Sequence, residues 1–556
     1  MAVSLPVGND SFSEIRENGD YFIDKSEVIS EILKDNFKVY LITRPRRFGK
    51  TLTMSMLEDF FDISRDSKKH FEGLKISENT SLCSEWMNQW PVIFITFKNV
   101  EGRKFENAYG ALKVFIADLC KKYSFLKHSE KVNPADKEQF TALEYQKAEE
   151  ENLRNSLILL TRMISMHYGK QCILLIDEYD VPLAKASENG YYNQMLDVVR
   201  ALFGALKTND YLKFAVITGC LKIAKESIFT GTNNFVSDTI SGERFDEYIG
   251  FTHDDVKKLL KDSGFSDHED EVRLWYDGYR FGTVNVYCPW DVLNHVAALQ
   301  INPNAKPKNY WGSTSHNGVI YRFISRKNLN VNDKFEVLMS GGILVEKITE
   351  DLTYDTLNSS ETNLWSLLLL TGYLTRTEMP EEYICNSESE MALRIPNEEV
   401  KIIFKNAIAD WFNEDVSNIN RESLFNAFWS GNEEIASEQV TDILFSTISY
   451  YDYSESYYHA FLAGLFAGVG YIVQSNYENG TGRPDIVVKD KVNRRALVIE
   501  VKHAKSEADI STQMEEAKNQ IIKSKYAWGL ERGYREVACY GVVFFEKTCV
   551  VSSVKT

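Results

Sequence analysis

Apolar runs alternate with amphipathic helical patterns through the first 250 residues. Four runs are continuous enough to be buried strands, and two long segments between them have the apolar spacing of helices. Uninterrupted apolar strands that alternate with helices are typical of a parallel sheet covered on both faces. The polar stretch 127–147 is expected to be a helical excursion or a loop. The predicted strands are 38–43, 92–97, 172–177 and 214–218, and the helical segments are 107–123 and 152–167.

The strand signal fades between residues 252 and 440, where helical patterns predominate, and a mixed pattern returns near residue 454. We therefore predict an α/β domain at 1–251, a mainly helical middle domain at 252–453 and a small α/β domain at 454–556. The middle domain contains the helical patterns 254–261, 291–299 and 399–412. The last domain is expected to contain helices at 457–468 and 511–525 and strands at 471–475, 485–488, 496–501 and 537–545.

The length and charge of the chain limit the classes of function. A chain of 556 residues is too long for a single hydrophobic core. Its 63 Lys and Arg against 80 Asp and Glu give a net charge of −17, which argues against a protein that coats nucleic acid through bulk charge. Residues 455–556 carry 14 basic and 12 acidic side chains, so phosphate contacts are expected near the C-terminus or in a local pocket.

The sequence indicates a cytoplasmic protein with no membrane partner. The N-terminus has no apolar signal segment, and the apolar stretches 364–374 and 457–473 are shorter than the ~20 residues that span a bilayer. Eight scattered cysteines without a CxxC pair indicate neither a zinc site nor a disulfide framework. Buried, reduced cysteines are the simpler interpretation.

The first predicted strand leads into RPRRFGKT at residues 44–51, and a helical pattern follows. This layout of strand, loop, Gly49-Lys50-Thr51 and helix is that of a P-loop, which binds nucleotide phosphates. Backbone N–H groups and the helix N-terminus would surround the phosphates of ATP. Lys50 would reach the β- and γ-phosphates, and the Thr51 hydroxyl would ligate Mg²⁺.

The arginines of this segment raise two questions. The P-loop pattern has glycine where Arg44 stands, and arginine is poorly suited to a positive φ, so a loop of different shape stiffened by Pro45 is expected. Arg46 and Arg47 either add positive charge near the phosphates or pair with acidic groups on the surface.

The apolar run 172–177 ends in Asp177 and is followed by Glu178. Because an α/β sheet binds ligands at the carboxyl ends of its strands, Asp177 would complete the Mg²⁺ shell and Glu178 would polarise the attacking water. An ordinary buried strand followed by surface acids is the alternative. Thr218 either senses the γ-phosphate or caps a helix, and Arg244 is either an arginine finger or part of a surface salt bridge.

A second group of chemically informative residues lies in GRPDIVV at 482–488 and ALVIEVK at 496–502. Side chains alternate along a strand, so Glu500 and Lys502 share one face. If the hairpin folds symmetrically about residues 492 and 493, Asp485 lies opposite Glu500. Two carboxylates suit Mg²⁺, or Mn²⁺ in its place, and Lys502 would orient a water or neutralise charge on a scissile phosphate. An exposed hairpin with solvated Glu500 and Lys502 is the alternative.

These residues resemble known motifs. Asp485, Glu500 and Lys502 match the PD-(D/E)xK nuclease motif, and the following helix, with Gln520 and Tyr526, is similar to the helix that many members place beside the site. The rest of the chain resembles the bacterial AAA-ATPase-like family in which an ATPase domain precedes such a nuclease domain. The resemblance implies that arginine in place of the P-loop glycine, as at Arg44, is usual in that family. The matching stretches are YFIDKS (21–26), RPRRFGKT (44–51), LIDEYDVPL (175–183), WYDGYRFG (275–282) and YWGSTS (310–315).

The resemblance implies a P-loop ATPase fused to a nuclease fold. Such folds often carry an upstream acid, for which this chain offers Glu455 or Glu478. Asp180 is expected to support the nucleotide site through its neighbours. The motif WYDGYRFG is read as packing between the ATPase and the middle domain, with a stacking platform for nucleic acid bases as the alternative.

The expected function is an ATP-regulated, Mg²⁺-dependent nuclease, with DNA the favoured substrate. A bacterial role in defence against foreign DNA would suit it, and homo-oligomers would be consistent with arginine fingers supplied in trans. The alternative is a nucleotide-switched interaction or signalling protein whose nuclease fold binds without cutting. A processive DNA translocase is a weaker interpretation, because the sequence shows no helicase motifs beyond the two nucleotide motifs.

Overall fold

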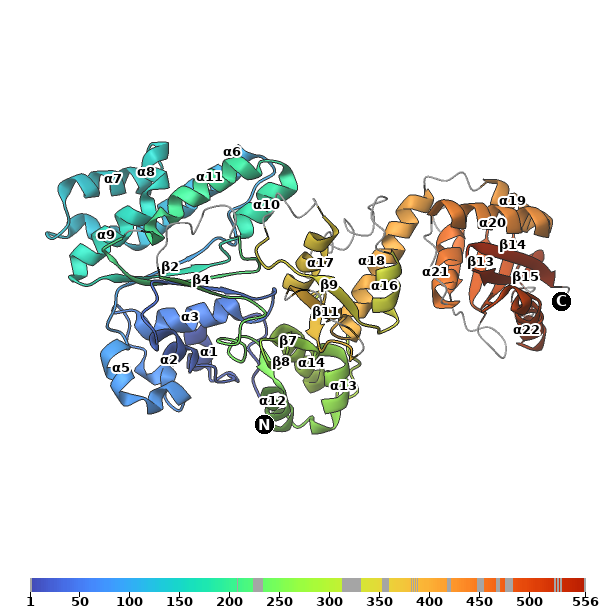
Figure 1. Cartoon of the computed structure of the whole chain (residues 1–556), viewed down its shortest axis with the longest axis horizontal. Coiled ribbons are helices and arrows are strands. Elements are labelled where there is room, and N and C mark those ends of the chain that lie inside the picture. Colours follow the sequence, from blue (N-terminus) through green and yellow to red (C-terminus); the bar gives the residue numbers. More distant parts are fainter. Residues whose placement is uncertain are drawn as a thin grey trace. The chain divides into compact units, whose positions relative to one another are not determined.

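The chain folds into two compact units, formed by residues 1–315 with 343–401 and by residues 316–342 with 402–556. The computed structural model describes residues 3–207, 209–223, 234–312, 332–352, 360–381, 383, 385, 387, 389–417, 422–447, 455–466, 471–475, 484–524, 527, 530 and 533–554 (Figure 1). None of the helices in these ranges combines the length and apolarity needed to cross a membrane.

A five-stranded parallel sheet is the centre of the first unit, and its strand order is β2-β3-β4-β1-β5. β1 and β3 are buried along their whole lengths, as their uninterrupted apolar sequences predict. Figure 1 shows α3 on one face of the sheet and α9 and α11 on the other. The predicted parallel sheet with helices on both faces is therefore confirmed. The strands are β1 (Val39–Thr43), β2 (Val92–Thr96), β3 (Cys172–Asp177), β4 (Leu212–Gly219) and β5 (Phe235–Asp238).

The helices around this sheet follow the amphipathic segments of the sequence. The predicted helix at 152–167 is divided at Asn155, and the polar stretch 127–147 contains a helix that begins at Pro134. The helices are α1 (Phe12–Asn18), α2 (Val28–Leu33), α3 (Lys50–Phe61), α4 (Lys68–Phe71), α5 (Thr80–Trp86), α6 (Phe105–Lys122), α7 (Pro134–Glu144), α8 (Glu150–Arg154), α9 (Ser156–Tyr168), α10 (Val181–Asn189) and α11 (Tyr192–Leu202). Short 3-10 helices are η1 (Lys75–Glu78), η2 (Ser124–His128) and η3 (Phe203–Leu206).

The middle of the chain is mainly helical, as expected, but it also contains two antiparallel three-stranded sheets, β6-β8-β7 and β10-β11-β9. Their strands have two to five residues, too few for a clear alternation in the sequence. The helices are α12 (His253–Ser263), η4 (Ser266–His268), α13 (Glu269–Tyr276), α14 (Pro289–Ile301), α17 (Glu361–Leu370) and α18 (Glu398–Ser417). The strands are β6 (Phe251–Thr252), β7 (Tyr279–Phe281), β8 (Val284–Tyr287), β9 (Leu344–Lys347), β10 (Thr375–Thr377) and β11 (Glu390–Arg394).

The division into units differs from the three predicted domains. The predicted boundary after residue 251 falls inside the first unit, because Phe48 of the loop after β1 packs against the rings of Tyr279 and Phe281. The predicted boundary after residue 453 falls inside the second unit, because Leu424 and Val440 belong to the same apolar core as the strands that follow.

The second unit contains a five-stranded mixed sheet of order β12-β13-β14-β15-β16, in which only β14 and β15 run parallel. Ile499 and Val501 of β14 join the core that includes α19, α20 and α21, whereas Val498 packs with Ile521 of α22 on the opposite face. The strands are β12 (Ile472–Ser475), β13 (Ile486–Asp490), β14 (Arg495–His503), β15 (Glu536–Phe545) and β16 (Thr548–Val554), the last of which was not predicted. The helices are α16 (Asn332–Met339), α19 (Glu422–Ser430), α20 (Glu433–Thr447), α21 (Glu455–Phe466), η5 (Glu507–Asp509) and α22 (Ile510–Ser524).

Candidate functional site

The loop between β1 and α3 brings the N-terminus of α3 to the carboxyl edge of the parallel sheet. Its left-handed residues are Arg47, with φ 72°, and Gly49, with φ 91°, which is the N-cap of α3. Arg44 is not in the left-handed region, so the conflict expected between arginine and a positive φ does not arise at that position.

Arg44 instead ties β1 to β5 beneath this loop. Its guanidinium is completely buried and pairs with the Asp238 carboxylate at 2.5 Å. It also donates to the carbonyl oxygens of Thr43 and Thr239 at 2.9 and 2.7 Å. Arg44 therefore has a structural role at the edge of the nucleotide motif, which the sequence did not reveal.

Four predicted nucleotide-site residues lie together where β1, β3 and β4 end. The buried Asp177 carboxylate accepts from the Thr51 hydroxyl at 2.8 Å and from the Thr218 hydroxyl at 2.5 Å. The Lys50 ammonium donates to the carbonyl oxygens of Arg44 and Pro45 at 2.9 and 2.8 Å. Because parallel neighbours end at the same edge, a threonine, an aspartate and a lysine from distant segments meet in one place. A hydroxyl beside a carboxylate is a ligand set that suits Mg²⁺.

The residues after Asp177 shape the same edge. Glu178 is half-buried with φ 52°, and burial together with Asp177 raises its pKa, against the opposing charge of Lys50. Asp180 accepts from the backbone N–H groups of Cys220 and Leu221, both at 3.1 Å. It therefore holds the backbone that follows β4, and its predicted support of the nucleotide site stays a prediction.

The three other arginines of the predicted site differ in their surroundings. Arg46 and Arg47 are exposed, and the Arg47 guanidinium lies 4.3 Å above the ring of Trp290. Arg244 pairs with Glu31 at 2.9 Å and with Asp35 at 3.0 Å. The structure thus shows the salt-bridge alternative for Arg244 and does not group its side chain with Lys50 and Asp177.

The motif at 275–282 contributes packing behind the nucleotide motif. Phe48 is buried, and its ring lies 4.9 Å from that of Tyr279 and 5.0 Å from that of Phe281. Gly278 has φ 103°, and a Cβ there would lie 2.0 Å from the Pro396 carbonyl oxygen. These aromatic rings serve as core, as the packing interpretation predicts.

A buried pair of acids nearby was not predicted. Asp291 and Glu399 are both inaccessible to solvent, and the Glu399 carboxyl accepts from the backbone N–H groups of Tyr310 and Trp311 at 2.6 and 2.9 Å. Burial and the neighbouring Asp291 hold the pKa of Glu399 well above its usual range. The pair therefore retains a proton at neutral pH.

The second predicted site forms on the hairpin of β13 and β14. The register pairs Ile486 with Ile499 and Asp490 with Arg495, which is the symmetry about residues 492 and 493 that the sequence predicts. Asp485, just before β13, accepts from the Val501 N–H at 2.9 Å. It therefore lies beside Glu500, which follows Ile499.

Glu500 is completely buried, and the Lys502 ammonium lies 3.4 Å from its Oε1. Burial, followed by the charge of Asp485, raises the pKa of Glu500 to about 7, while Lys502 opposes the shift. Glu500 Oε2 has no hydrogen-bond partner among the described residues. A buried carboxylate oxygen without a partner is costly, and a divalent cation would satisfy it. Asp485, Glu500 and Lys502 therefore fit a metal site.

α22 covers the face of the sheet on which this site lies. Val498 packs with Ile521 of α22, and alternation along β14 places Glu500 and Lys502 on the same face as Val498. Gln520, next to Ile521, is half-buried. The side chain of Glu455 and the residues Glu478 and Tyr526 lie outside the described residues.

Two family models match the chain over these sites. Residues 6–229 match the model described as predicted AAA-ATPase, and residues 453–554 match that of the PD-(D/E)XK nuclease superfamily. The chain is also 25% identical over 496 residues to an Azotobacter chroococcum mcd 1 protein named "Uncharacterized protein in vnfD 5'region", with 87% of this chain and 86% of the relative covered. The similarity to this relative therefore extends over most of both chains.

Proposed function

Residues 6–229 are a predicted AAA-ATPase domain and residues 453–554 belong to the PD-(D/E)XK nuclease superfamily, and from this premise we propose an ATP-controlled nuclease. The first domain would bind and hydrolyse ATP. The second would hydrolyse nucleic acid phosphodiesters, with DNA as the preferred substrate. The nucleotide state of the first domain would control the rate of cleavage by the second.

The grouping at the carboxyl edge of the parallel sheet supports the ATPase half. Lys50 and the first backbone N–H groups of α3 would bind the phosphates, since a helix N-terminus attracts anions. Thr51 and Asp177 would hold Mg²⁺. Glu178 would accept a proton from the attacking water, a role that its raised pKa favours. Thr218 would keep Asp177 oriented through their hydrogen bond.

The observation that carries the nuclease half is the buried Glu500 carboxylate, with one unpartnered oxygen, beside Asp485 and Lys502. Asp485 and Glu500 would hold Mg²⁺, or Mn²⁺ in its place. A bound metal at such a site supplies an activated water and charge stabilisation. Lys502 would orient the water and neutralise charge on the phosphate, and Val501 N–H keeps the Asp485 carboxylate in place.

The first experiment measures cleavage and ATP hydrolysis separately on the full-length protein. Plasmid DNA, single-stranded DNA and RNA are incubated with Mg²⁺ or Mn²⁺, with and without ATP. Lys502→Ala is expected to abolish cleavage, whereas Lys505→Ala, an exposed lysine on the same segment, is expected to retain it. Lys50→Ala is expected to abolish ATP hydrolysis, whereas the exposed Lys69→Ala retains it.

Two outcomes would count against the proposal. Cleavage that survives Lys502→Ala would mean that another site or a contaminant cuts the substrate. ATP hydrolysis that depends on Lys50, with no cleavage under any condition, would favour a nucleotide-switched interaction protein instead.

A further inference from the structure

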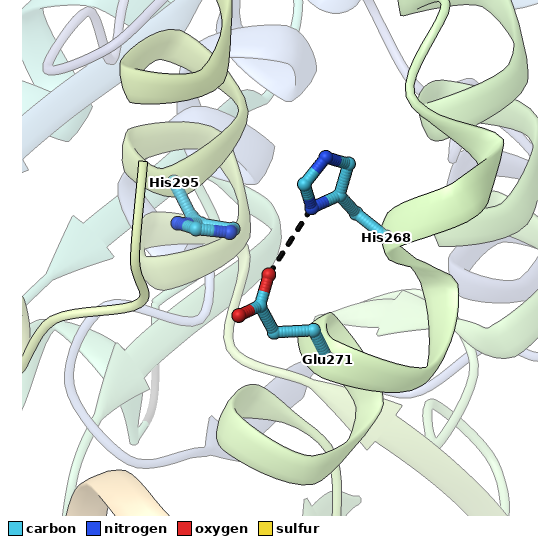
Figure 2. Close-up of side chains that lie close together, drawn as sticks. All are labelled: His268, Glu271 and His295. Atoms are coloured by element: carbon cyan, nitrogen blue, oxygen red, sulfur yellow. Dashed lines mark hydrogen bonds and ion pairs between the residues drawn. The ribbon is translucent and has the colours of Figure 1, made fainter. Parts of the chain in front are cut away.

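Two histidines and a glutamate meet in the first unit, outside both sites described above. His268 is the last residue of η4, Glu271 lies in the first turn of α13, and His295 lies on α14. Figure 2 shows their side chains converging from these three elements. One ligand atom from each residue lies within 4.8 Å of the other two. Imidazole nitrogens and a carboxylate oxygen are the ligands that Zn²⁺ and related ions use in proteins.

His295 is the residue that ordinary packing does not explain. Its side chain is inaccessible to solvent, and neither ring nitrogen has a hydrogen-bond partner among the described residues. Its ring lies beside that of Tyr276, with the ring centroids 5.6 Å apart. A buried polar group without a hydrogen-bond partner is destabilising, so the completely buried imidazole of His295 indicates a place for a bound ligand.

The Glu271 carboxylate places a negative charge beside the two imidazoles. The Glu271 carboxylate lies 3.1 Å from His268 Nδ1, and its other oxygen is 3.7 Å from the Lys306 ammonium, which is 87% exposed. An imidazole binds a metal ion through a nitrogen lone pair, and neither His295 nitrogen has a hydrogen-bond partner among the described residues.

We propose that His268, Glu271 and His295 form a binding site for a divalent transition metal of the zinc class. His268 and Glu271 are partly exposed, so water has access to a fourth position. Zn–N and Zn–O bonds of about 2.0–2.1 Å place tetrahedral ligand atoms roughly 3.3 Å apart, so ligand atoms now within 4.8 Å of one another would move closer by up to about 1.5 Å. The bound ion would tie η4 and α13 to α14.

This site differs in kind from the two Mg²⁺ sites. Two of its three ligands are imidazoles, whereas Mg²⁺ prefers oxygen ligands. The cysteine spacing that argued against a zinc site in the sequence is irrelevant here, since no cysteine takes part. The proposal is also independent of the nuclease proposal, because it rests on residues that neither site uses.

The test measures Zn²⁺ affinity of the full-length protein by competition with a chromophoric chelator, in excess Mg²⁺ to occupy the oxygen sites. Wild type is expected to bind one Zn²⁺ equivalent tightly, and Glu271→Gln and His295→Ala are expected to weaken binding by at least tenfold. His253→Ala is the matched control, because His253 Nε2 lies 3.3 Å from Glu269 but belongs to no such three-residue group within the described part of the chain. Asp485→Ala is expected to bind Zn²⁺ as wild type does.

Co²⁺ substitution and thermal unfolding supply independent readouts. Co²⁺ bound by wild type is expected to give the intense visible absorption of a tetrahedral site, and Zn²⁺ is expected to raise the melting temperature of wild type but not of Glu271→Gln. Glu271 is partly exposed, so its variant tests the proposal even if His295→Ala fails to fold. Absence of tight Zn²⁺ binding in wild type, or unchanged affinity in Glu271→Gln, would overturn the proposal.

Discussion

The buried ion pair between Arg44 and Asp238 predicts a large loss of stability for Arg44→Gly, which installs the usual P-loop residue. Asp238 is 4% exposed, so the variant would leave its carboxylate buried without a cation. The carbonyl oxygens of Thr43 and Thr239 would lose their donor as well. Removing one partner of a buried pair costs about 3–5 kcal/mol.

The expected shift follows from the size of the first unit, about 370 residues. An unfolding entropy of about 2.1 cal/mol/K per residue gives this unit ~0.8 kcal/mol/K. A loss of about 3–5 kcal/mol then lowers its melting temperature by about 4–6 °C.

Calorimetry of the full-length protein measures this shift, and Asp238→Asn completes a double-mutant cycle. The loss of stability in the double variant is expected to be roughly 2 kcal/mol smaller than the sum of the losses in the two single variants, because the double variant leaves no unpaired buried charge. Arg47→Gly, on the same loop, is the control: with φ 72° and an exposed side chain, it is expected to be neutral or mildly stabilising. A melting temperature for Arg44→Gly within 1 °C of wild type, or additive losses in the cycle, would contradict a stabilising role for the buried pair of Arg44 and Asp238.

Three further predictions concern the sites and the buried acids. Thr218→Val removes a hydrogen bond to Asp177 of about 1.5–3 kcal/mol. The kcat for ATP hydrolysis is therefore expected to fall roughly 10–100-fold, with the affinity for ATP retained. A change in kcat below twofold in steady-state assays would contradict this expectation. Because the pKa of Glu500 is raised to about 7, protons compete with the metal for this carboxylate below that pH. The Mg²⁺ affinity measured by calorimetry is therefore expected to rise with pH up to about 7 and then to remain constant. An affinity that does not change with pH would argue against Glu500 as a ligand. The Glu399 carboxyl keeps its proton in the folded state, whereas the unfolded chain releases that proton above the ordinary pKa of a glutamate. The free energy of unfolding of the first unit is therefore expected to fall by up to ~1.4 kcal/mol for each pH unit between pH 5.5 and pH 9. Glu399→Gln, which keeps a neutral side chain beside Asp291, should flatten this slope in melting experiments, and an unchanged slope would count against the buried proton.

Features set by short segments could be predicted from the sequence. The apolar run before Asp177 specifies β3, and parallel pairing then brings Asp177 to Thr51 and Thr218. The hairpin of β13 and β14 has the predicted register, because its polar turn lies midway between Asp485 and Glu500.

Features that depend on distant partners could not be predicted. The role of Arg44 depends on Asp238, far along the chain, and no local pattern links the two. His295 looks like one more polar residue on an amphipathic helix until folding buries it beside Glu271. The sequence leaves Arg244 open between an arginine finger and a surface salt bridge, and its distant partners Glu31 and Asp35 show the salt bridge.

The most direct test of the central claim is the initial rate of substrate cleavage in the presence of ATP, ADP or no nucleotide. If the ATPase domain controls the nuclease, the wild-type rate differs between these conditions, Lys50→Ala cleaves at one rate in all three, and Lys502→Ala does not cleave in any. Equal rates for wild type in all three conditions, or a nucleotide response that persists in Lys50→Ala, would contradict control of the nuclease by the ATPase domain.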